Sequence, residues 1–382
     1  MPKPIVIVGG GALGSSTACF LSQLDPGRPI VVIERDPTYT TASSALSSSS
    51  LRQQFSTGVS IELSRFGYDF MASSPDIASQ VSLMPRGYLF LGQSHQEQGL
   101  RRRTAFAQSY GVRILEHAPE DLKRKYPWMN VEDLAYAAEG AAGEGWFDGY
   151  SLMRLYQSRA RASGVHFIHA AVTDFLIEQN LIKSVVLSNQ TCIEPDCVVN
   201  AAGPWSGKLA AKMGVKIPVH AKRRSAFLVS CPTPIENFPI LIDCSGVYIR
   251  PEQHHFILNV SPPHEEDLDD LPLDPDFSIF EEKMWPALAA RIPAFESLRI
   301  ERAWAGYYEF NTADHNGLVG QIGPDNFFVA TGFSGHGLMH SPGVGRGMAE
   351  LLTYGEYRSL DLSPLSPRRL HTGELIVEEA VY

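Results

Sequence analysis

Apolar and small residues alternate in a regular order over the first part of the chain. A short apolar run, Ile5–Val8, leads into a glycine-rich stretch at 9–14, and residues 12–24 have apolar positions at helical spacing. A second apolar run at 30–33 ends at Glu34. Short runs of this kind are typical of buried parallel strands. The pattern therefore predicts a strand, a glycine-rich turn, a helix, and a second strand that ends in an acidic residue.

The middle of the chain has short strands separated by turns. Helical spacing at 61–71 predicts a helix, and a further helical pattern ends at Met213. From 218 to 310, the expected strands have both apolar and polar positions and turn residues are frequent, and this pattern predicts an antiparallel sheet. Four successive strands are expected before it, at 165–169, 172–177, 182–187 and 192–199.

Near its end the chain has another apolar run followed by a glycine-rich stretch, although no internal repeat is visible. An apolar run at 327–330 predicts a buried strand that leads into the glycine-rich stretch 331–339. A helix of small residues is expected at 342–352. Upstream, the acidic stretch 265–270 is rich in turn residues, which favours a solvated surface loop over a metal site.

Composition narrows the class of protein. The chain has 382 residues, 44% hydrophobic and 19% charged, with a net charge of −10. Its length predicts two domains, and its hydrophobic content excludes a disordered chain. The acidic balance argues against nucleic acid as a partner, and the arginine triplet 101–103 is expected on a solvated helix face. No apolar stretch is long enough to span a membrane.

Cysteine usage and the start of the chain bear on the compartment. Five cysteines form an odd set without a C-x-x-C spacing, so we expect no disulfide framework and a reducing environment. Structured sequence begins at Pro4, and we expect no signal peptide. The predicted location is cytoplasmic. The cysteines are Cys19, Cys192, Cys197, Cys231 and Cys244.

The first turn has the residues that a dinucleotide site needs. Gly9 permits the tight turn, Gly11 lets the backbone approach a pyrophosphate, and Gly14 lets the helix pack close to the strand. The helix N-terminus offers N–H groups and partial positive charge to phosphates. Glu34, 20 residues after Gly14, is placed to accept hydrogen bonds from a ribose diol, which disfavours NADP.

Two further stretches suggest which dinucleotide is bound. Residues 40–60 are rich in serine, and they are interpreted either as a flexible linker or as small residues packed against a planar cofactor. The stretch 331–339 supplies a second helix N-terminus near the first fold. Such an end stabilises the negative charge that a reduced isoalloxazine ring gains, so this arrangement favours FAD over NAD.

These motifs together resemble the D-amino-acid-oxidase-like flavoproteins, which include sarcosine oxidase, glycine oxidase, dimethylglycine dehydrogenase and D-arginine dehydrogenase. The resemblance covers essentially the whole chain and rests on 9–14, Glu34-Arg35, 199–205, 304–306 and 332–337. The C-terminal stretches look most like the branch of a mitochondrial FAD-dependent oxidoreductase domain-containing protein linked to complex I assembly. The block 222–227 also resembles the D-arginine dehydrogenase branch.

The resemblance implies an α/β FAD-binding Rossmann-like domain with an interleaved α+β substrate domain built on a mainly antiparallel sheet. The FAD-binding domain would comprise residues 1–85, 145–217 and 315–382, and the substrate domain 86–144 and 218–314. Glu34 would hold the adenosine ribose, Arg35 would flank the adenine, and Val172 would contact it through its backbone. The other implied cofactor contacts are Gly9, Gly11, Ala12, Leu13, Gly14, Ser43, Ser44, Ser49, Ser50, Leu51, Arg52, Ala201, Ala202, Gly203, Trp205, Gly306, Gly335, His336, Gly337, Leu338 and Met339.

Substrate residues follow the family pattern only in part. Arg224 or Arg223, and Tyr248, fall where the D-arginine dehydrogenase branch holds its ligand. Tyr308 stands where other members have a carboxylate-binding arginine, and Asn259 stands where sarcosine oxidases have a lysine that promotes reaction with oxygen. The resemblance thus favours a dehydrogenase. A cysteine for covalent attachment has no match, so we expect non-covalent FAD.

Several interpretations stay open at this point. Arg52, Tyr248, Tyr308, His336 and Arg224 are the candidate catalytic residues, and no metal is expected at His336 and His340, which lack a third ligand. His336 is either a flavin contact or a structural histidine, and Tyr307 and Tyr308 are either core aromatics or active-site hydroxyls.

The leading hypothesis is FAD-dependent oxidation of an amine or amino acid, with hydride transfer to flavin N5 and hydrolysis of the imine. The electron acceptor would be oxygen or a quinone or dye. The alternatives are a 2-hydroxyacid dehydrogenase with His336 as base, and a flavoprotein that acts in assembly of a partner complex.

Overall fold

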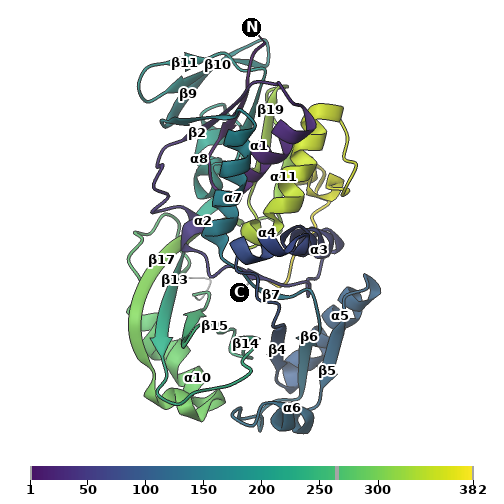
Figure 1. Cartoon of the computed structure of the whole chain (residues 1–382), viewed down its shortest axis with the longest axis vertical. Coiled ribbons are helices and arrows are strands. Elements are labelled where there is room, and N and C mark those ends of the chain that lie inside the picture. Colours follow the sequence, from purple (N-terminus) through teal and green to yellow (C-terminus); the bar gives the residue numbers. More distant parts are fainter. Residues whose placement is uncertain (1, 263–265, 381–382) are drawn as a thin grey trace.

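The apolar run Ile5–Val8 forms β1, which lies inside a six-stranded sheet (Figure 1). The structure, a computed structural model, describes residues 2–262 and 266–380. β1 pairs in parallel with the strands on both sides of it, and only the edge strand β18 runs antiparallel to its neighbour. In spatial order the strands are β18 (Leu318–Gln321), β19 (Phe327–Thr331), β12 (Cys197–Asn200), β1, β2 (Ile30–Glu34) and β8 (His166–His169).

Both faces of this sheet are covered, as expected for a parallel sheet. Ile5 and Ile7 face a core that they share with helices on one side, whereas Val6 and Val8 face a core on the other side. The first side is covered by α1 (Ala12–Leu24), α3 (Gly58–Ala72), α7 (Gly149–Ala162) and α11 (Gly337–Tyr354). The second side is covered by a small sheet of β9 (Val172–Glu178), β10 (Leu181–Leu187) and β11 (Cys192–Ile193), together with α8 (Ser206–Ala211).

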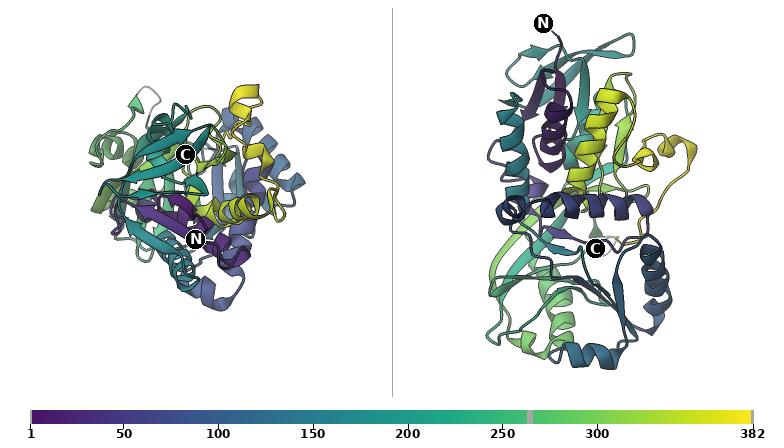
Figure 2. Two further views of the ribbon diagram at one scale, coloured as in Figure 1. Left: turned by 90° about the horizontal axis from the view of Figure 1, so that it is seen from above. Right: turned by 45° about the vertical axis from the view of Figure 1, so that its right-hand side comes forward.

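A second, eight-stranded sheet lies below the first in Figure 1, with α3 and α4 (Pro75–Gln80) between them, as the right-hand view of Figure 2 also shows. Its pairs are antiparallel except for β14 with β4. The expected two-sheet fold, one mainly parallel and one mainly antiparallel, is confirmed. In spatial order its strands are β17 (Arg299–Asn311), β13 (Val219–Ser230), β16 (His255–Asn259), β15 (Tyr248–Glu252), β14 (Ile240–Ile242), β4 (Tyr88–Gly92), β6 (Tyr136–Gly140) and β5 (Ile114–His117).

One face of the second sheet packs on α6 (Pro119–Lys125) and α10 (Trp285–Arg291). Phe227, Ile249 and Leu258 point into this core, so their neighbours along each strand point to the opposite face. Among the described residues, no helix is long and apolar enough to cross a bilayer. The remaining elements are β3 (Ser50–Leu51), β7 (Gly145–Trp146), α2 (Ser43–Leu46), α5 (Ser94–Ser109), α9 (Phe277–Ile279), α12 (Arg369–Thr372), the 3-10 turns η1 (Gly203–Trp205), η4 (Pro293–Ser297) and η5 (Ser363–Leu365), and the π-helical turn η3 (Phe280–Met284).

The single strand expected at 192–199 is wrong. The structure divides it into β11, which pairs with β10, and β12, which lies between β1 and β19 in the other sheet. Pro195 lies between the two strands and has no N–H to donate to a ladder. The next amide, that of Asp196, already donates to Pro4 O at the start of β1. The proline therefore marks the point where the chain passes from one sheet to the next.

The helix expected at 342–352 begins five residues earlier, at Gly337, and contains Pro342. A proline inside a helix leaves the carbonyl four residues before it without its amide donor. Here that carbonyl belongs to Leu338, and Ser341 Oγ donates to it at 2.8 Å. The side chain just before the proline thus replaces the missing bond, and the helix continues through it.

Candidate functional site

The glycine-rich turn after β1 is closed tightly against its surroundings. Gly9 has φ +103°, and a Cβ there would lie 2.3 Å from Ala201 O. A Cβ on Gly14 would lie 1.9 Å from Gly9 O, so only glycine lets α1 pack this close to β1. Gly14 itself is outside the cavity that opens beyond the turn, and its role is in packing.

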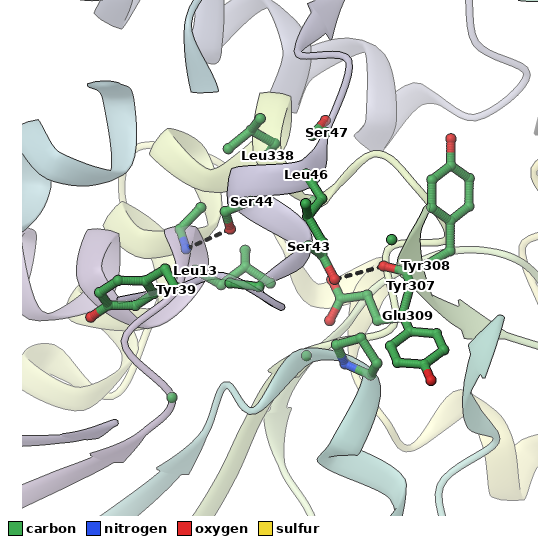
Figure 3. A pocket seen from close by; sticks show the side chains of 18 of the residues that line it. Leu13, Tyr39, Ser43, Ser44, Leu46, Ser47, Tyr307, Tyr308, Glu309 and Leu338 are labelled. Carbon is green, nitrogen blue, oxygen red and sulfur yellow. Dashed lines mark hydrogen bonds between the residues drawn. The ribbon is translucent and has the colours of Figure 1, made fainter. Parts of the chain in front are cut away.

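One cavity extends from this turn to the second sheet (Figure 3). It brings together nearly all of the residues expected at the cofactor and all five catalytic candidates. Its wall contains Gly9, Gly11, Ala12, Leu13, Glu34, Arg35, Ser43, Ser44, Ser49, Ser50, Arg52, Val172, Ala201, Ala202, Gly203, Trp205, Gly306, Gly335, His336, Gly337, Leu338, Met339, Arg224, Tyr248 and Tyr308.

Leu51 is the other expected contact that is not in this wall. Leu51, on β3, is fully buried in the core that the helices form on the first side of the six-stranded sheet. Ser50 and Arg52, on either side of it, line the cavity. Successive residues of a strand point to opposite sides, so the Leu51 side chain on β3 points away from the cavity that Ser50 lines. Its placement as a cofactor contact is therefore corrected to a packing role.

Glu34 is fixed at the end of β2 by two backbone amides. Its Oε2 accepts from Gly10 N at 2.7 Å and its Oε1 accepts from Asp36 N at 2.8 Å. Next to it, the Arg35 guanidinium stacks on the Trp205 ring at 3.5 Å. These contacts hold a carboxylate and a flat cationic surface at one end of the cavity.

The serine-rich stretch is ordered against the cavity and is not a flexible linker. Ser44 Oγ accepts from Ala12 N at 3.0 Å, at the first turn of α1 (Figure 3). Ser43 Oγ donates to Tyr307 O at 2.6 Å, and Ser48 Oγ donates to Asn259 Oδ1 at 2.8 Å. The stretch thus connects the glycine-rich turn with two strands of the second sheet.

Arg52 and His336 form a buried pair beside the cavity. Arg52 is 2% exposed, and its Nη2 donates to His336 Nε2 at 2.9 Å and also to Ala380 O. Its Nη1 donates to Gln54 O at 2.7 Å, and its guanidinium lies over the Phe55 ring at 4.0 Å. Burial and the neighbouring Arg52 charge hold the pKa of His336 well below its usual range. His336 is therefore a neutral acceptor toward Arg52.

Strand register explains the opposite end of the cavity. Ala226 is paired with Asn259, which is paired with Tyr248, so the three side chains share one face of the sheet. Arg224 lies two residues from Ala226 on that face, and Tyr308 lies two residues from Gly306, the partner of Arg224. This face is the one opposite the α10 core, and it forms the wall of the cavity.

Two buried donors at this end have no hydrogen-bond partner among the described residues. These are Tyr248 Oη and Arg224 Nε. Burial raises the pKa of Tyr248 to about 12, so its hydroxyl keeps its proton. The Arg224 Nη atoms donate to both carboxylate oxygens of Asp267, at 2.7 and 3.0 Å. Buried donors without partners are uncommon in proteins and indicate a place for a polar ligand.

The acidic stretch is not simply a solvated loop. Asp267 has a side chain that is only 15% exposed, because it is paired with Arg224, and Asp269 is paired with Lys222 and His220. Glu265 lies outside the described residues. Arg223, the alternative to Arg224 as a ligand contact, is outside the cavity wall and is paired with Asp276.

Sequence reasoning missed several residues of the wall, among them Tyr39, Tyr88 and Glu309. Glu309 is the one charged residue in the stretch 303–310, whose other members are small or aromatic, and that local contrast was a usable signal. Tyr39 and Tyr88 have no such signal, because their neighbours come from distant parts of the chain. Of the two tyrosines left open, Tyr307 donates to Leu271 O at 2.6 Å, and Tyr308 lies 5.1 Å beneath the Arg224 guanidinium.

Comparison with known families gives the identity of the fold. The sequence model of the family described as FAD dependent oxidoreductase (DAO) matches residues 4–351. The chain is a member of the FAD-dependent oxidoreductase family. The chain is 38% identical to the "FAD-dependent oxidoreductase domain-containing protein 1" of Xenopus laevis, over 99% of this chain and 84% of that protein.

Two other similar proteins are enzymes named for amino acids. The chain is 27% identical to mitochondrial sarcosine dehydrogenase of Mus musculus, over 96% of this chain and 41% of that protein. The crystal structure of L-proline dehydrogenase from P. horikoshii superposes with a TM-score of 0.85 at 27% identity, over 98% of this chain and all of that chain.

The residues present fit the FAD of this oxidoreductase family. The cavity offers a position for a phosphate at the tight turn of Gly9 and a position for a ribose at the Glu34 carboxylate. It offers a position for a polar ligand at the two unpartnered donors. FAD is the cofactor. None of the five cysteines is in the described wall of the cavity, in keeping with non-covalent binding.

Proposed function

We propose that this oxidoreductase oxidises the C–N bond of an amino acid with a substituted nitrogen. When bound, FAD would supply the oxidant, taking two electrons as a hydride from the carbon next to nitrogen. The substrate nitrogen must be neutral at that moment, and the imine product is hydrolysed by water to an amine and a carbonyl compound. The observation that carries the proposal is the pair of unpartnered donors, Tyr248 Oη and Arg224 Nε, at the end of the cavity remote from Glu34.

These two donors fit a substrate carboxylate. Tyr248 and Arg224 share one face of the second sheet, so their free N–H and O–H groups line the same part of the cavity. Asp267 takes both Nη atoms of Arg224 and leaves Nε to the ligand. A carboxylate that accepts from both donors would satisfy the two buried groups at once. Sarcosine and proline, named in two of the relatives, are both amino acids with a secondary amine.

The contacts of His336 favour an amine over a 2-hydroxy acid. Hydroxyl oxidation needs a base for the O–H proton, and His336 was the candidate. Its Nε2 already accepts from Arg52, and its lowered pKa makes it a poor base at neutral pH. An amine that is bound neutral needs no protein base for the hydride step.

Anaerobic reduction of the bound flavin tests the proposal. The holoenzyme is mixed without oxygen with sarcosine, N-methyl amino acids, proline, primary amino acids, simple amines and 2-hydroxy acids, and loss of the visible flavin absorbance is followed. We expect bleaching by N-substituted amino acids and none by the matching amines that lack a carboxylate. Bleaching by 2-hydroxy acids alone would overturn the amine assignment, and no bleaching by any compound would favour the assembly role.

A matched pair of variants tests the carboxylate site. Tyr248→Phe removes one donor and keeps the ring, and we expect the substrate concentration for half-maximal bleaching to rise at least tenfold. Tyr307→Phe serves as the control, because the Tyr307 hydroxyl donates to Leu271 O outside the proposed carboxylate site. Equal effects of the two substitutions would contradict the placement of the carboxylate at Tyr248.

A further inference from the structure

Glu309 is a buried carboxyl group in the cavity wall that the proposed reaction does not use. It lies on β17, and only 8% of it is exposed. Its Oε2 accepts from Thr331 Oγ1 at 3.0 Å, and its Oε1 faces Phe333 N at 3.4 Å. A Cβ on Gly337, the first residue of α11, would lie 2.8 Å from Oε1. Glu309 therefore lies between the end of β19 and the start of α11, in the same part of the cavity as Tyr307 and Tyr308 (Figure 3).

The charge of Glu309 is poorly compensated in this position. None of the ion pairs among the described residues includes it. Burial raises its pKa to about 7, although hydrogen bonds from Thr331 and from the Gly332 and Phe333 amides oppose this rise. The Phe333 amide, at 3.4 Å, is at the long limit of a hydrogen bond.

The charged and titratable groups on the elements around Glu309 are occupied elsewhere. β13 places Ala221 opposite Glu309, and the flanking His220 and Lys222 both bind Asp269. At the start of α11, His336 is neutral and bound to Arg52. Tyr308, next to Glu309 on β17, has a pKa raised by burial and keeps its proton.

A protonated carboxyl group also needs an acceptor for its O–H. The Phe333 amide can only donate to Glu309, whereas the Thr331 hydroxyl also lies 3.3 Å from Gly203 O and can accept from Oε2 when it donates there. Oε1 has no acceptor among these two neighbours, so a proton on Oε1 needs one from the cavity. FAD has acceptor oxygens along its whole length. Glu309 lies beside Gly337, at the helix N-terminus that we expect next to the flavin ring, and this position corresponds to the flavin and ribityl half of the cofactor.

We propose that Glu309 binds FAD as the neutral acid and donates its proton to an oxygen of the flavin or ribityl half. FAD is dianionic at its pyrophosphate, which further disfavours a negative carboxylate in the same cavity. Binding then selects the protonated form of Glu309. By linkage, FAD binds more weakly as the pH rises above the pKa of Glu309 in the FAD-free protein, and each FAD released above that pH also releases a proton.

Dilution of the holoenzyme tests this proposal without any substrate. Holoenzyme is diluted into buffers from pH 6 to 9, and released FAD is measured by its fluorescence. We expect the dissociation constant to rise about tenfold per pH unit above neutrality, close to 100-fold by pH 9. In Glu309→Gln the amide keeps a donor at all pH values, so the dissociation constant is expected to stay constant from pH 6 to 9. A titration of FAD itself would appear equally in both proteins.

Two controls make the result decisive. Glu144 is equally buried with a pKa also raised to about 7, and it is outside the cavity wall, so Glu144→Gln is expected to keep the wild-type pH dependence of FAD release. ADP shares only the adenosine half of FAD, and its dissociation constant is expected to be independent of Glu309. A dependence with ADP would move the acceptor to the phosphates and overturn the assignment to the flavin half.

The wild-type protein alone gives a second readout. FAD release at pH 8 in weak buffer is expected to release about one proton per FAD, measured with an indicator dye. Release without a proton, or a dissociation constant of the unmodified protein that is the same at pH 6 and 9, would overturn the proposal, even if Glu309→Gln failed to fold.

Discussion

Individual residues of the cavity have hydrogen bonds on one side and a free face on the other. Glu34 shows this most clearly, because both of its oxygens accept from backbone amides of Gly10 and Asp36. The carboxylate is therefore oriented before any ligand binds, and its remaining lone pairs face the cavity. When a ribose diol donates to this carboxylate, no side-chain entropy is lost in ordering Glu34.

Replacement of Glu34 tests the adenosine end of the site. Glu34→Ala removes the acceptor for the ribose and leaves the Gly10 amide without its partner, so we expect FAD to bind about 10- to 100-fold more weakly. Glu34→Gln keeps one acceptor oxygen and should have an intermediate effect. Flavin fluorescence after dilution measures both. Unchanged FAD content in Glu34→Ala would show that the carboxylate does not contact the cofactor.

Asn259 provides a residue-scale test of the electron acceptor. It lies in the cavity wall between Ala226 and Tyr248 and accepts from Ser48, and it carries no charge. A fixed cation near the reduced flavin stabilises the anionic species formed as oxygen takes the first electron. Asn259→Lys is therefore expected to speed reoxidation by oxygen at least tenfold, measured by stopped flow.

Asn259→Gln serves as the uncharged control in that experiment and should reoxidise as the wild type does. The unmodified protein is expected to react faster with a quinone or dye than with oxygen. Rapid peroxide formation by the unmodified protein would contradict the dehydrogenase assignment and support an oxidase.

At the scale of whole elements, helix-to-helix contact depends on glycines of α11. A Cβ on Gly345 would lie 2.1 Å from Ser16 Oγ and 2.7 Å from Ser16 C on α1. Both helices belong to the core that covers the six-stranded sheet. The close approach of α1 and α11 places the two helix N-termini that face the cavity, so its loss would affect both fold and cofactor binding.

Gly345→Ala is expected to destabilise the protein by about 1–3 kcal/mol, the usual cost of overpacking a core. Gly99 in α5 is the matched control, because a Cβ there meets no atom within 4 Å. Gly99→Ala should be neutral or stabilise by up to about 1 kcal/mol, since alanine loses less backbone entropy in a helix. Thermal unfolding of both variants checks this; equal destabilisation would contradict the packing argument.

Local patterns predicted the elements well, and contacts between distant segments were not predictable. The bounds of α1 and β1 follow from apolar spacing, which is local. By contrast, Arg52 donates to Ala380 O, more than 300 residues away, and Glu378 accepts from Ser56 and Thr57 at the start of α3. The spacing of apolar residues along the chain carries no information about such distant pairs. The same holds for the Asp267 partner of Arg224, which a charge-rich loop did not reveal.

At the scale of the whole molecule, two buried carboxyl groups and two buried histidines have opposite effects on stability over the same pH range. Burial raises the pKa of Glu144 and of Glu309 to about 7, so the folded protein binds protons there that the unfolded chain releases above about 4.5. Burial lowers the pKa of His340 to about 3 and that of His336 also falls, so the unfolded chain binds protons there below about 6.5. The first pair makes stability fall as pH rises, and the second makes it rise.

We therefore expect the free energy of unfolding to change little between pH 4.5 and 6.5. Glu144→Gln removes one opposing group, and the free energy of unfolding should then rise by about 2 kcal/mol from pH 5 to 6.5, relative to the wild-type profile. Denaturant unfolding at several pH values measures this. Glu194→Gln is the control, since Glu194 is exposed and its replacement should leave the profile unchanged. A Glu144→Gln profile parallel to the wild type would contradict the assignment.

The strand order of the six-stranded sheet has a consequence for biosynthesis. β12 lies beside β19, and about 130 residues separate them along the chain. Translation proceeds at roughly 5–20 residues per second. The edge of β12 that pairs with β19 therefore stays unpaired for on the order of 6–25 s, until β19 has been synthesised. An unpaired apolar strand edge is a template for wrong pairing between nascent chains. The cell that makes this protein must protect that edge for seconds in every round of synthesis, and slow translation between β12 and β19 is expected to lower the soluble yield.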